Sequence, residues 1–455
     1  MNRNILTKAA CAAIGLAAVS SAFAADPEIE AMKQQLAAQQ KLIDQLMAAQ
    51  ARAPQSPTEA SEVEQRLRDR QKGALNEPVS AAPTPAPPPP VRFYGIADVS
   101  VVAANSGAGT KMRIEGGGGK APSRLGVQIT KNISDVKVTA VAEAGLFFNT
   151  GSTGAAAPVL GLNDTNVSSG GAPGTGSQIF SRQIWAGVDA GFGQFSIGRQ
   201  YTGSYVSVAA IGSAHGDGLF GNAAVLTPLI GGMPTRLNNS LIWATPQVAN
   251  LRGVFTYTTG AENNISGTAT AATTSTTARA GAGFDAAGIY AFNGGQVAAT
   301  TWGINNASYV TAGETGLARK KGYQLSANYD FGPFRLFGNF VHGTISGGNY
   351  QNVTKTLSSA TGYGLSFLVP FGKHNITAAW TRLDDKSLLN RDGTMYGLSY
   401  FYNYTPDTSF YGSVGKMQNN RNASYSLNDG SNLVGNTTHP GFSPSGLETG
   451  MNFKF

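Results

Sequence analysis

From Val91 to the C-terminus, apolar and polar residues alternate along the chain with a period of two. In Gly322–Phe331 the odd positions carry Tyr, Leu, Ala, Tyr and Phe, and the even positions carry Gly, Gln, Ser, Asn and Asp. Val91–Val101 and Thr394–Tyr404 repeat this alternation. Successive side chains of a β-strand point to opposite faces of its sheet. The pattern therefore predicts strands with one apolar face and one small or polar face.

Composition decides which kind of sheet this is. Charged residues make up 13% of the chain, about half of the roughly 25% that is usual for soluble proteins. The chain contains 58 glycines, and 9% of its residues are aromatic. It has no run of about 18 apolar residues, which excludes a protein that spans the membrane with helices. We predict an all-β protein, an antiparallel transmembrane β-barrel whose outer wall faces lipid and whose interior faces water.

The connections between the predicted strands alternate in length. Short turns on one rim and long loops on the other are typical of bacterial barrels. The 365 residues from Val91 to Phe455 accommodate 16 strands at about 23 residues per strand and connection. The expected turns are 132–135, 191–193, 293–295, 332–333, 372–373 and 406–407, and the expected long loops are 150–177, 201–237, 261–277, 344–356 and 419–445.

The N-terminal segment 1–24 has the features of a secretory signal peptide. Arg3 and Lys8 precede a short apolar stretch, and Ala22–Ala24 fits a cleavage site. Cys11, the single cysteine, lies within this segment. We therefore expect the mature chain to contain no disulfide and no reactive thiol.

Residues 25–75 predict a periplasmic helical segment with a short heptad pattern. A coiled coil of under three heptads is marginal unless something else holds several copies together, and the alternative is a single helical linker. A second helix is expected over Thr58–Lys72. The Pro-rich residues 76–90 predict an extended spacer before the barrel, residues 91–455. The heptad positions are Ile29, Met32, Leu36, Gln39, Ile43 and Leu46.

The formal net charge of +7 belongs to the barrel. Residues 91–455 contain 24 Lys and Arg against 17 Asp and Glu, whereas residues 25–90 contain seven against nine. The basic residues are scattered rather than gathered in a run, so nucleic acid is not an expected partner. A positively biased pore, or contact with anionic lipid, explains the excess better.

The sequence shows no pattern typical of an enzyme or of a metal site. The four histidines, His215, His342, His374 and His439, are far apart and lack metal-ligand spacing. No Gly-x-Ser-x-Gly motif occupies a strand-to-helix turn, and Asp384–Asp385 is interpreted as part of a solvated turn. We expect no catalytic residue, no cofactor and no metal.

Several segments of the barrel carry recognisable motifs: Val91–Asp98, Ser123–Gly126, Phe180–Gln183, Ile197–Tyr201, Asn238–Pro246, Tyr329–Gly332 and Met451–Phe455. In order and spacing they resemble strands of the Gram-negative trimeric porins, in particular the β-proteobacterial general porins. The resemblance implies a 16-stranded barrel that forms a homotrimer. It also implies that a third extracellular loop, here residues 201–237, folds into the lumen. The helical segment and the Pro-rich spacer lie outside the core pattern of this family.

By the same resemblance, arginines of the barrel wall project into the constriction of anion-selective relatives. The matching residues are Arg124, Arg182 and Arg236, with Arg199 near the base of the loop. A guanidinium in a narrow, partly dehydrated lumen attracts anions and raises the barrier to cations. The loop brings one carboxylate, Asp217, where the family's loop brings more acids, so strong cation preference is not expected. These five residues form the predicted pore constriction.

Strand parity favours some of these arginines over others. Arg124 lies on the face opposite Leu125, and Arg236 on the face opposite Leu241. Arg182 shares its parity with the apolar Ile184, so it needs a bulge, or a position above the lipid, to point inward. For each arginine the alternative is a rim position that contacts lipopolysaccharide phosphate or solvent.

Aromatic residues near the ends of the predicted strands indicate girdles at the two membrane interfaces. Most of them are expected to do nothing more specific. They are Tyr94, Phe147, Phe148, Trp243, Tyr329, Phe331, Tyr396, Tyr404 and Phe455.

Together these features predict an outer-membrane porin through which small hydrophilic solutes diffuse passively, with a preference for anions. One alternative is a substrate-specific channel, for example for organic acids. Another is a structural tether that binds the cell wall through the N-terminal extension, with a secondary pore. The expected partners are two further copies of the chain in a homotrimer, outer-membrane lipid and lipopolysaccharide, small solutes or anions, and peptidoglycan.

Overall fold

The chain divides into two units, Met1–Ala81 and Ala82–Phe455, and the described residues belong to the second. A computed structural model describes residues 90–115, 119–149, 151–153, 179–214, 220–222, 226, 233–260, 282–306, 318–346, 359–388, 390–427 and 439–455. The expected signal peptide (1–24), helical segment (25–75) and Pro-rich spacer (76–90) lie outside these residues, apart from Pro90. Among the described residues, no helix has the length and apolarity needed to cross a membrane.

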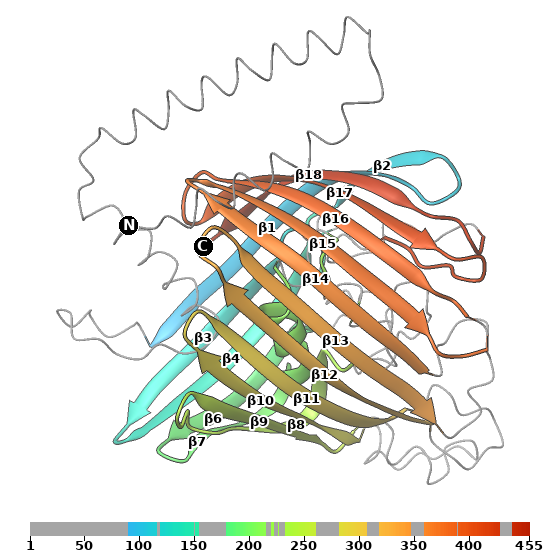
Figure 1. Ribbon diagram of the computed structural model, residues 1–455. Coiled ribbons are helices and arrows are strands. Elements are labelled where there is room, and N and C mark those ends of the chain that lie inside the picture. The colour runs from blue at the N-terminus through green and yellow to red at the C-terminus, as the bar shows by residue number, and fades with distance from the viewer. Residues whose placement is uncertain are drawn as a thin grey trace, which may run out of the picture. The chain divides into compact units, whose positions relative to one another are not determined.

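The described residues form one antiparallel sheet of eighteen strands, and each long strand pairs with its neighbours in the chain (Figure 1). β2 and β3 pair with successive halves of β1 and together occupy the position of the second strand in the wall. β5 is a two-residue strand on the end of β4. When β2 is counted with β3, and β5 with β4, the wall of the described barrel has sixteen strand positions.

The strands have the following bounds: β1 Val91–Asn105, β2 Thr110–Glu115, β3 Arg124–Ile133, β4 Val136–Phe147, β5 Ser152–Thr153, β6 Gln183–Ala190, β7 Gly193–Tyr201, β8 Arg236–Ala244, β9 Leu251–Thr258, β10 Gly283–Phe292, β11 Gly295–Asn306, β12 Ala318–Asp330, β13 Arg335–Ser346, β14 Ser359–Phe371, β15 His374–Asp385, β16 Gly393–Asn403, β17 Thr408–Asn419 and β18 Ser445–Lys454.

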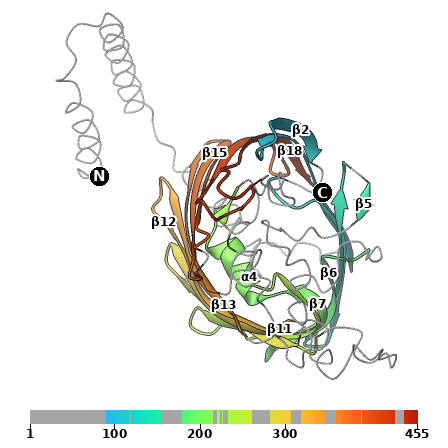
Figure 2. The same cartoon turned by 90° about the vertical axis from the view of Figure 1, so that its right-hand side faces the viewer.

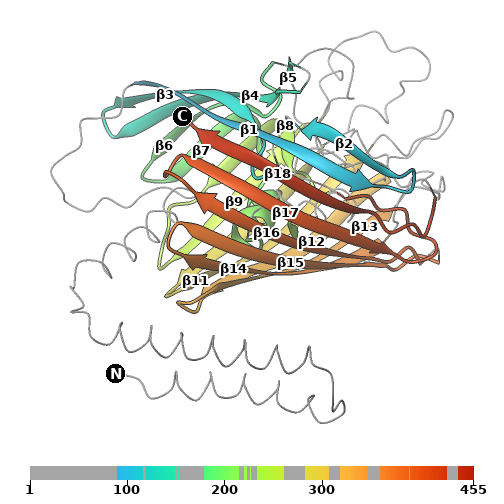
Figure 3. The same ribbon diagram turned by 90° about the horizontal axis from the view of Figure 1, so that it is seen from above.

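The first and last strands close the sheet. β1 pairs with β18 from Ile96 opposite Lys454 to Asn105 opposite Ser445, and Figure 3 shows the two strands side by side. The C-terminal Phe455 extends the seam, because its backbone oxygen accepts a hydrogen bond from the Gly95 N–H at 2.9 Å. Closure pairs the first strand with the last, so that neither is left as a free edge of the sheet in lipid. The predicted 16-stranded antiparallel barrel is confirmed.

The period-two alternation of the sequence separates the two faces of the wall. In β12 the outward residues Tyr323 and Leu325 are 51% and 53% exposed, whereas the inward residues Gln324 and Ser326 are each 1% exposed. Apolar side chains therefore cover the outside, where lipid is the solvent. The buried polar side chains lie inside, against the segments that enter the barrel.

Aromatic side chains stack along the outer wall near the short turns. The Trp243 ring lies 5.8 Å from the ring of Phe195 and 5.6 Å from that of Phe255, centroid to centroid. Farther around the wall, Phe292 and Tyr329 stack at 6.1 Å. Such amphipathic and apolar rings are typical of a membrane interface.

All six expected short turns connect adjacent strands. Two of them need glycine, because Gly294 and Gly332 have φ angles of +85° and +92°, which L-residues rarely adopt. Residues 116–123 separate β2 from β3, so two shorter strands occupy the second position of the 16-stranded wall. The sequence motifs gave no sign of this interruption.

Candidate functional site

The chain between β7 and β8, the predicted loop 201–237, enters the barrel. α4 (Gly203–Val206) and a π-helical turn, η1 (Ser207–Ile211), follow β7 directly, and Figure 2 shows α4 inside the ring of strands. Thr202 caps α4, because its hydroxyl oxygen accepts a hydrogen bond from the Tyr205 N–H at 3.1 Å. The first part of the loop is therefore a short, capped helix on the inner side of the wall.

Polar side chains on β10, β11 and β12 hold this helix. The Ser204 backbone N–H donates to Asp285 Oδ1 at 3.2 Å, and its hydroxyl donates to Thr300 Oγ1 at 2.9 Å. Gln324 Nε2 donates to the Ser204 carbonyl at 3.3 Å. The small and polar inner face of these strands thus supplies partners for a backbone that has left the sheet.

Farther along the loop, Phe220 is seated on glycines of β16 and β17. The Phe220 side chain is fully buried. A Cβ atom added to Gly415 would lie 2.5 Å from Phe220 Cγ, and one added to Gly397 would lie 2.7 Å from the Phe220 carbonyl oxygen. Asn222 follows and donates to the Trp380 carbonyl at 2.7 Å. The loop therefore crosses from the β10 side of the interior to the β16 side.

A β-bulge at the end of β7 turns Arg199 into the barrel. The register between β7 and β8 shifts at Gly198, whose φ of +130° suits glycine. Regular alternation would place Arg199 on the outer face with Ile197. Instead, its side chain is 7% exposed, Nε donates to the Ser181 carbonyl at 2.7 Å, and Nη1 donates to Asn238 Oδ1 at 2.6 Å.

Arg182 lies at a bend immediately before β6 begins at Gln183. Its backbone N–H donates to the Glu143 carbonyl at 3.2 Å, and its Nε donates to Glu143 Oε1 at 2.7 Å. The two side chains are 5% and 3% exposed. Because Arg182 stands outside the regular strand, the unfavourable parity with Ile184 does not govern its direction.

The carboxylate of Glu143, on β4, also contacts two further residues. The hydroxyl of Tyr94 donates to Glu143 Oε2 at 3.0 Å, and Arg124 Nη1 lies 3.9 Å from Oε1. Arg124 also donates from Nε to the Pro122 carbonyl at 3.0 Å. The expectation that Tyr94 belongs to an outer aromatic girdle is wrong, because the even residues of this part of β1 point inward.

Arg236, the first residue of β8, lies opposite Tyr201, the last residue of β7. The Arg236 Cζ atom is 4.2 Å from the centroid of the Tyr201 ring, and its Nη2 donates to the Tyr201 hydroxyl oxygen. Arg182 Nη2 donates to the same oxygen at 2.5 Å. One phenol therefore joins an arginine of β8 to an arginine of the bend before β6.

Within the described residues, four guanidiniums form what we call the arginine cluster. Those of Arg124 and Arg182 contact the Glu143 carboxylate, that of Arg236 is joined to Arg182 through the Tyr201 hydroxyl, and that of Arg199 is held by Ser181 and Asn238. Asp217, the fifth predicted residue, lies outside the described residues. Charges held at a low-dielectric site interact more strongly than in water. The cluster thus offers planar N–H donors and excess positive charge, which suit an anion.

Residues 119–123, between β2 and β3, also lie against the inner wall. Asp98 is fully buried, and its carboxylate accepts hydrogen bonds from the backbone N–H groups of residues 119 and 121 at 3.1 and 2.9 Å and from the Tyr411 hydroxyl at 2.5 Å. The segment brings Lys120 Nζ to 2.7 Å from Ser409 Oγ. Sequence reasoning missed this lysine, because strand parity says nothing about an interrupted strand.

Glu143 and Tyr201 were also missed. Glu143 does carry a local signal, since it is a lone carboxylate on the inward parity of β4, shared with Thr139 and Val141. Its three partners come from β1, β3 and the bend before β6, and the position of Glu143 in the sequence does not identify them. Across the part of the chain that the structure describes, no group of His, Cys, Asp or Glu side chains could hold a metal ion.

In sequence, the chain matches a family model but no individual curated protein. A family model described as Gram-negative porin matches residues 73–422. No curated protein matches the chain in sequence.

Several solved structures share the fold of the barrel at low sequence identity. The anion-selective porin from Comamonas acidovorans is 17% identical, with a TM-score of 0.63 over 80% of this chain and 99% of that one. The trimer form of OmpT, an outer membrane protein of Vibrio cholerae, is 13% identical, with a TM-score of 0.55 over 80% and 99%. OmpF of Salmonella typhi, in complex with daunomycin, is 13% identical, with a TM-score of 0.52 over 80% and 97%.

Proposed function

This chain belongs to the Gram-negative porin family, and from that premise we propose that its outer-membrane channel passes small hydrophilic solutes by passive diffusion and prefers anions. The observation that carries the preference is the composition of the arginine cluster. Among the described residues it sets four guanidiniums against the single carboxylate of Glu143. Fixed positive charge in a narrow lumen lowers the energy of an anion and raises that of a cation.

The loop supports the same proposal. α4 and η1 follow directly after Tyr201 and are fixed to the wall through Ser204. A loop held beside the arginine cluster narrows the aqueous path there, so that a solute passes close to the guanidiniums. We propose Arg124, Arg182, Arg199, Arg236 and Asp217 as the constriction residues.

Reversal potentials in a potassium chloride gradient test this function. The wild-type channel is expected to favour chloride, and Arg182→Gln and Arg236→Gln are each expected to lower that preference. Arg113→Gln is the control, because it removes the same charge from β2, where the arginine side chain is 40% exposed and paired with Glu115. A wild-type reversal potential that favours potassium would contradict the anion proposal.

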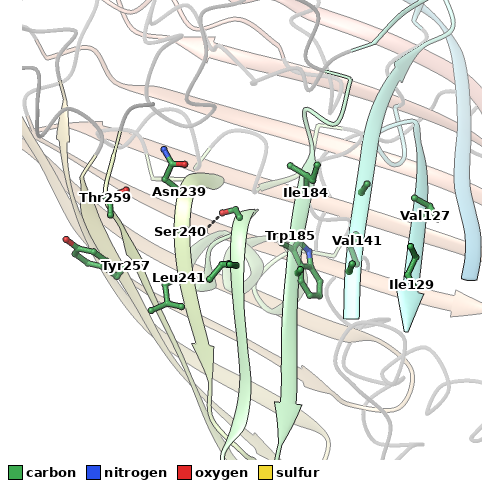
Figure 4. A pocket seen from close by; sticks show the side chains of 15 residues that line it. Val127, Ile129, Val141, Ile184, Trp185, Asn239, Ser240, Leu241, Tyr257 and Thr259 are labelled. Atoms are coloured by element: carbon green, nitrogen blue, oxygen red, sulfur yellow. Dashed lines mark hydrogen bonds between the residues drawn. The ribbon is translucent and has the colours of Figure 1, made fainter. Parts of the chain in front are cut away.

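The outer wall supports assembly into a homotrimer. An apolar hollow of about 960 Å³ lies over β3 to β9 (Figure 4), where small residues such as Ala140 and Ala186 stand among Ile129, Ile184 and Leu241. A concave face with small side chains suits close packing against a second copy of the wall. Ala186→Arg is expected to yield monomers, measured by native mass spectrometry in detergent. A trimer of unchanged stability would contradict this choice of interface.

A substrate-specific channel for organic acids is the second candidate. Guanidinium groups bind carboxylates through paired N–H donors, and the arginine cluster presents such groups from β3, β7, β8 and the bend before β6. If the channel selects organic acids, a dicarboxylate should reduce the chloride current at concentrations where sulfate does not. Equal effects of the two anions would favour the general pore.

Residues 25–75 carry a separate proposal, based on their heptad pattern. We propose that they form a periplasmic three-stranded coil in the trimer, because a trimeric barrel would raise their effective concentration. Contact of this extension with peptidoglycan would make the protein a tether as well as a pore. Co-sedimentation of the full chain with peptidoglycan tests this, with a chain lacking residues 26–90 as the control.

A further inference from the structure

Tyr201 occupies a position between two cations of the arginine cluster. Its hydroxyl oxygen accepts hydrogen bonds from Nη2 of Arg182, at 2.5 Å, and from Nη2 of Arg236. Arg182 comes from the bend before β6, and Arg236 comes from the start of β8. A phenol oxygen can accept two such bonds, so the two guanidiniums meet at one atom in spite of their like charges.

The two arginines depend on this contact to different degrees. Arg182 also has the Glu143 carboxylate, at 2.7 Å from its Nε. For the Arg236 guanidinium, Tyr201 is the one hydrogen-bond partner found in the described part of the chain, and Arg236 Nε is buried without a partner there. The same arginine lies over the Tyr201 ring at 4.2 Å. The direction of the Arg236 side chain therefore rests on Tyr201.

The Tyr201 ring also connects the cluster to the loop. It stacks on the ring of Tyr205, which belongs to α4, with centroids 5.1 Å apart and an angle of 10° between the planes. Tyr201 itself ends β7, whose bulge directs Arg199 inward. One side chain thus contacts the wall arginines through its hydroxyl and the loop through its ring.

We propose that Tyr201 is a positioning residue that sets the ion preference of the channel by fixing the Arg182 and Arg236 guanidiniums. This inference rests on the proposed anion preference. Tyr201→Phe removes the shared acceptor and keeps the ring, so the stacking on Tyr205 and the width of the path are retained. Without the acceptor, Arg236 loses its hydrogen bond and turns away from its neighbour. Selectivity then falls while conductance stays.

The test compares reversal potential and single-channel conductance in wild type and Tyr201→Phe. The chloride-to-potassium permeability ratio is expected to fall by about twofold or more, equivalent to about 0.4 kcal/mol, with conductance unchanged. In an Arg236→Gln background, Tyr201→Phe is expected to change the ratio much less. Tyr323→Phe is the control, because that tyrosine is 51% exposed on the outer face of β12, outside the hollow proposed as the trimer interface.

The possible results separate the role of Tyr201 from the proposed anion preference. An unchanged permeability ratio in Tyr201→Phe, or an equal fall with and without Arg236, would overturn the role of Tyr201 even if the wild type prefers chloride. A wild type without chloride preference would instead remove the proposed function itself. If Tyr201→Phe fails to form channels, Arg236→Lys tests the same contact, because it keeps the charge and loses the planar group that lies on the ring. A lowered ratio supports the proposal, and an unchanged ratio opposes it.

Discussion

Glu143 and Arg182 form an ion pair of 2.7 Å inside the barrel, with both side chains almost completely buried. The partners come from β4 and from the bend before β6, and Tyr94 and Arg124 complete the surroundings of the carboxylate. Glu143 therefore has two roles. It stabilises a cluster of like charges, and it reduces the positive charge that a passing ion meets.

These two roles predict opposite effects for Glu143→Gln. The chloride preference should rise, because the cluster loses its negative charge, while the barrel should become less stable by about 3–5 kcal/mol, the usual cost of removing one partner of a buried ion pair. Reversal potential and the temperature of unfolding on gels measure the two effects. Asp330→Asn is the control, since its ion pair with Arg335 is partly exposed and is worth at most about 1 kcal/mol. An equal loss of stability in both variants would contradict the structural role.

Asp285→Asn should loosen the attachment of the loop. The Asp285 carboxylate accepts the Ser204 N–H at the start of α4, and a hydrogen bond to a charged group contributes about 1.5–3 kcal/mol. More frequent brief closures are expected in single-channel recordings, with the mean open conductance retained. Asp407→Asn, in an exposed turn, should leave the record unchanged. Identical closure rates in wild type and Asp285→Asn would show that the carboxylate does not hold the loop.

Gly415→Ala should displace the loop from the wall. The new Cβ would lie 2.5 Å from Cγ of Phe220, which is fully buried, and overpacking of this kind costs about 1–3 kcal/mol. The single-channel conductance should change while the barrel remains folded. Gly412→Ala is a matched control in the same strand, because a Cβ atom added there would lie 3.8 Å from its nearest neighbour, the Glu448 carbonyl oxygen. If both variants conduct like wild type, the packing of Phe220 against β17 does not determine the conducting path through the barrel.

Tyr425→Phe should weaken the segment that follows β17. The Tyr425 hydroxyl donates to the Arg391 carbonyl at 2.6 Å, and leaving that buried acceptor unpaired costs about 1–3 kcal/mol. Faster proteolysis within residues 420–427 of the folded barrel is the expected result. Cleavage rates equal to those of wild type would show that the bond contributes little.

Burial, together with the nearby Asp385 carboxylate, raises the pKa of Tyr425 above its usual value. The unfolded tyrosine ionises near about pH 10, so its contribution to stability is complete below that pH and is lost as the pH rises toward the folded pKa. In the folded protein, wild type and Tyr425→Phe should therefore show the same phenolate absorbance between about pH 10 and 11. An additional phenolate in wild type would contradict the raised pKa.

The barrel itself could be predicted from local patterns. The alternation in Gly322–Phe331 is a property of adjacent residues, and it assigns Tyr323 to lipid and Gln324 to the interior without knowledge of any other strand. The short turns at Gly294 and Gly332 are equally local, because each depends on the φ angle of one residue. The sequence could therefore establish the class of sheet, its closure in lipid and the positions of the turns.

The arrangement of the cluster was decided by tertiary structure. Arg182 and Arg199 point inward against strand parity, one from a bend and the other from a bulge, and parity alone would have placed both outside. Glu143 meets Arg182 from 39 residues away, and Tyr201 meets Arg236 from 35 residues away. These contacts depend on the register between strands and on where regular pairing stops. Periodicity in a sequence indicates which face of the sheet a residue takes. A site built from several strands also depends on which residues lie at the same level along the barrel axis. That alignment is fixed only when the strands pair in the folded chain.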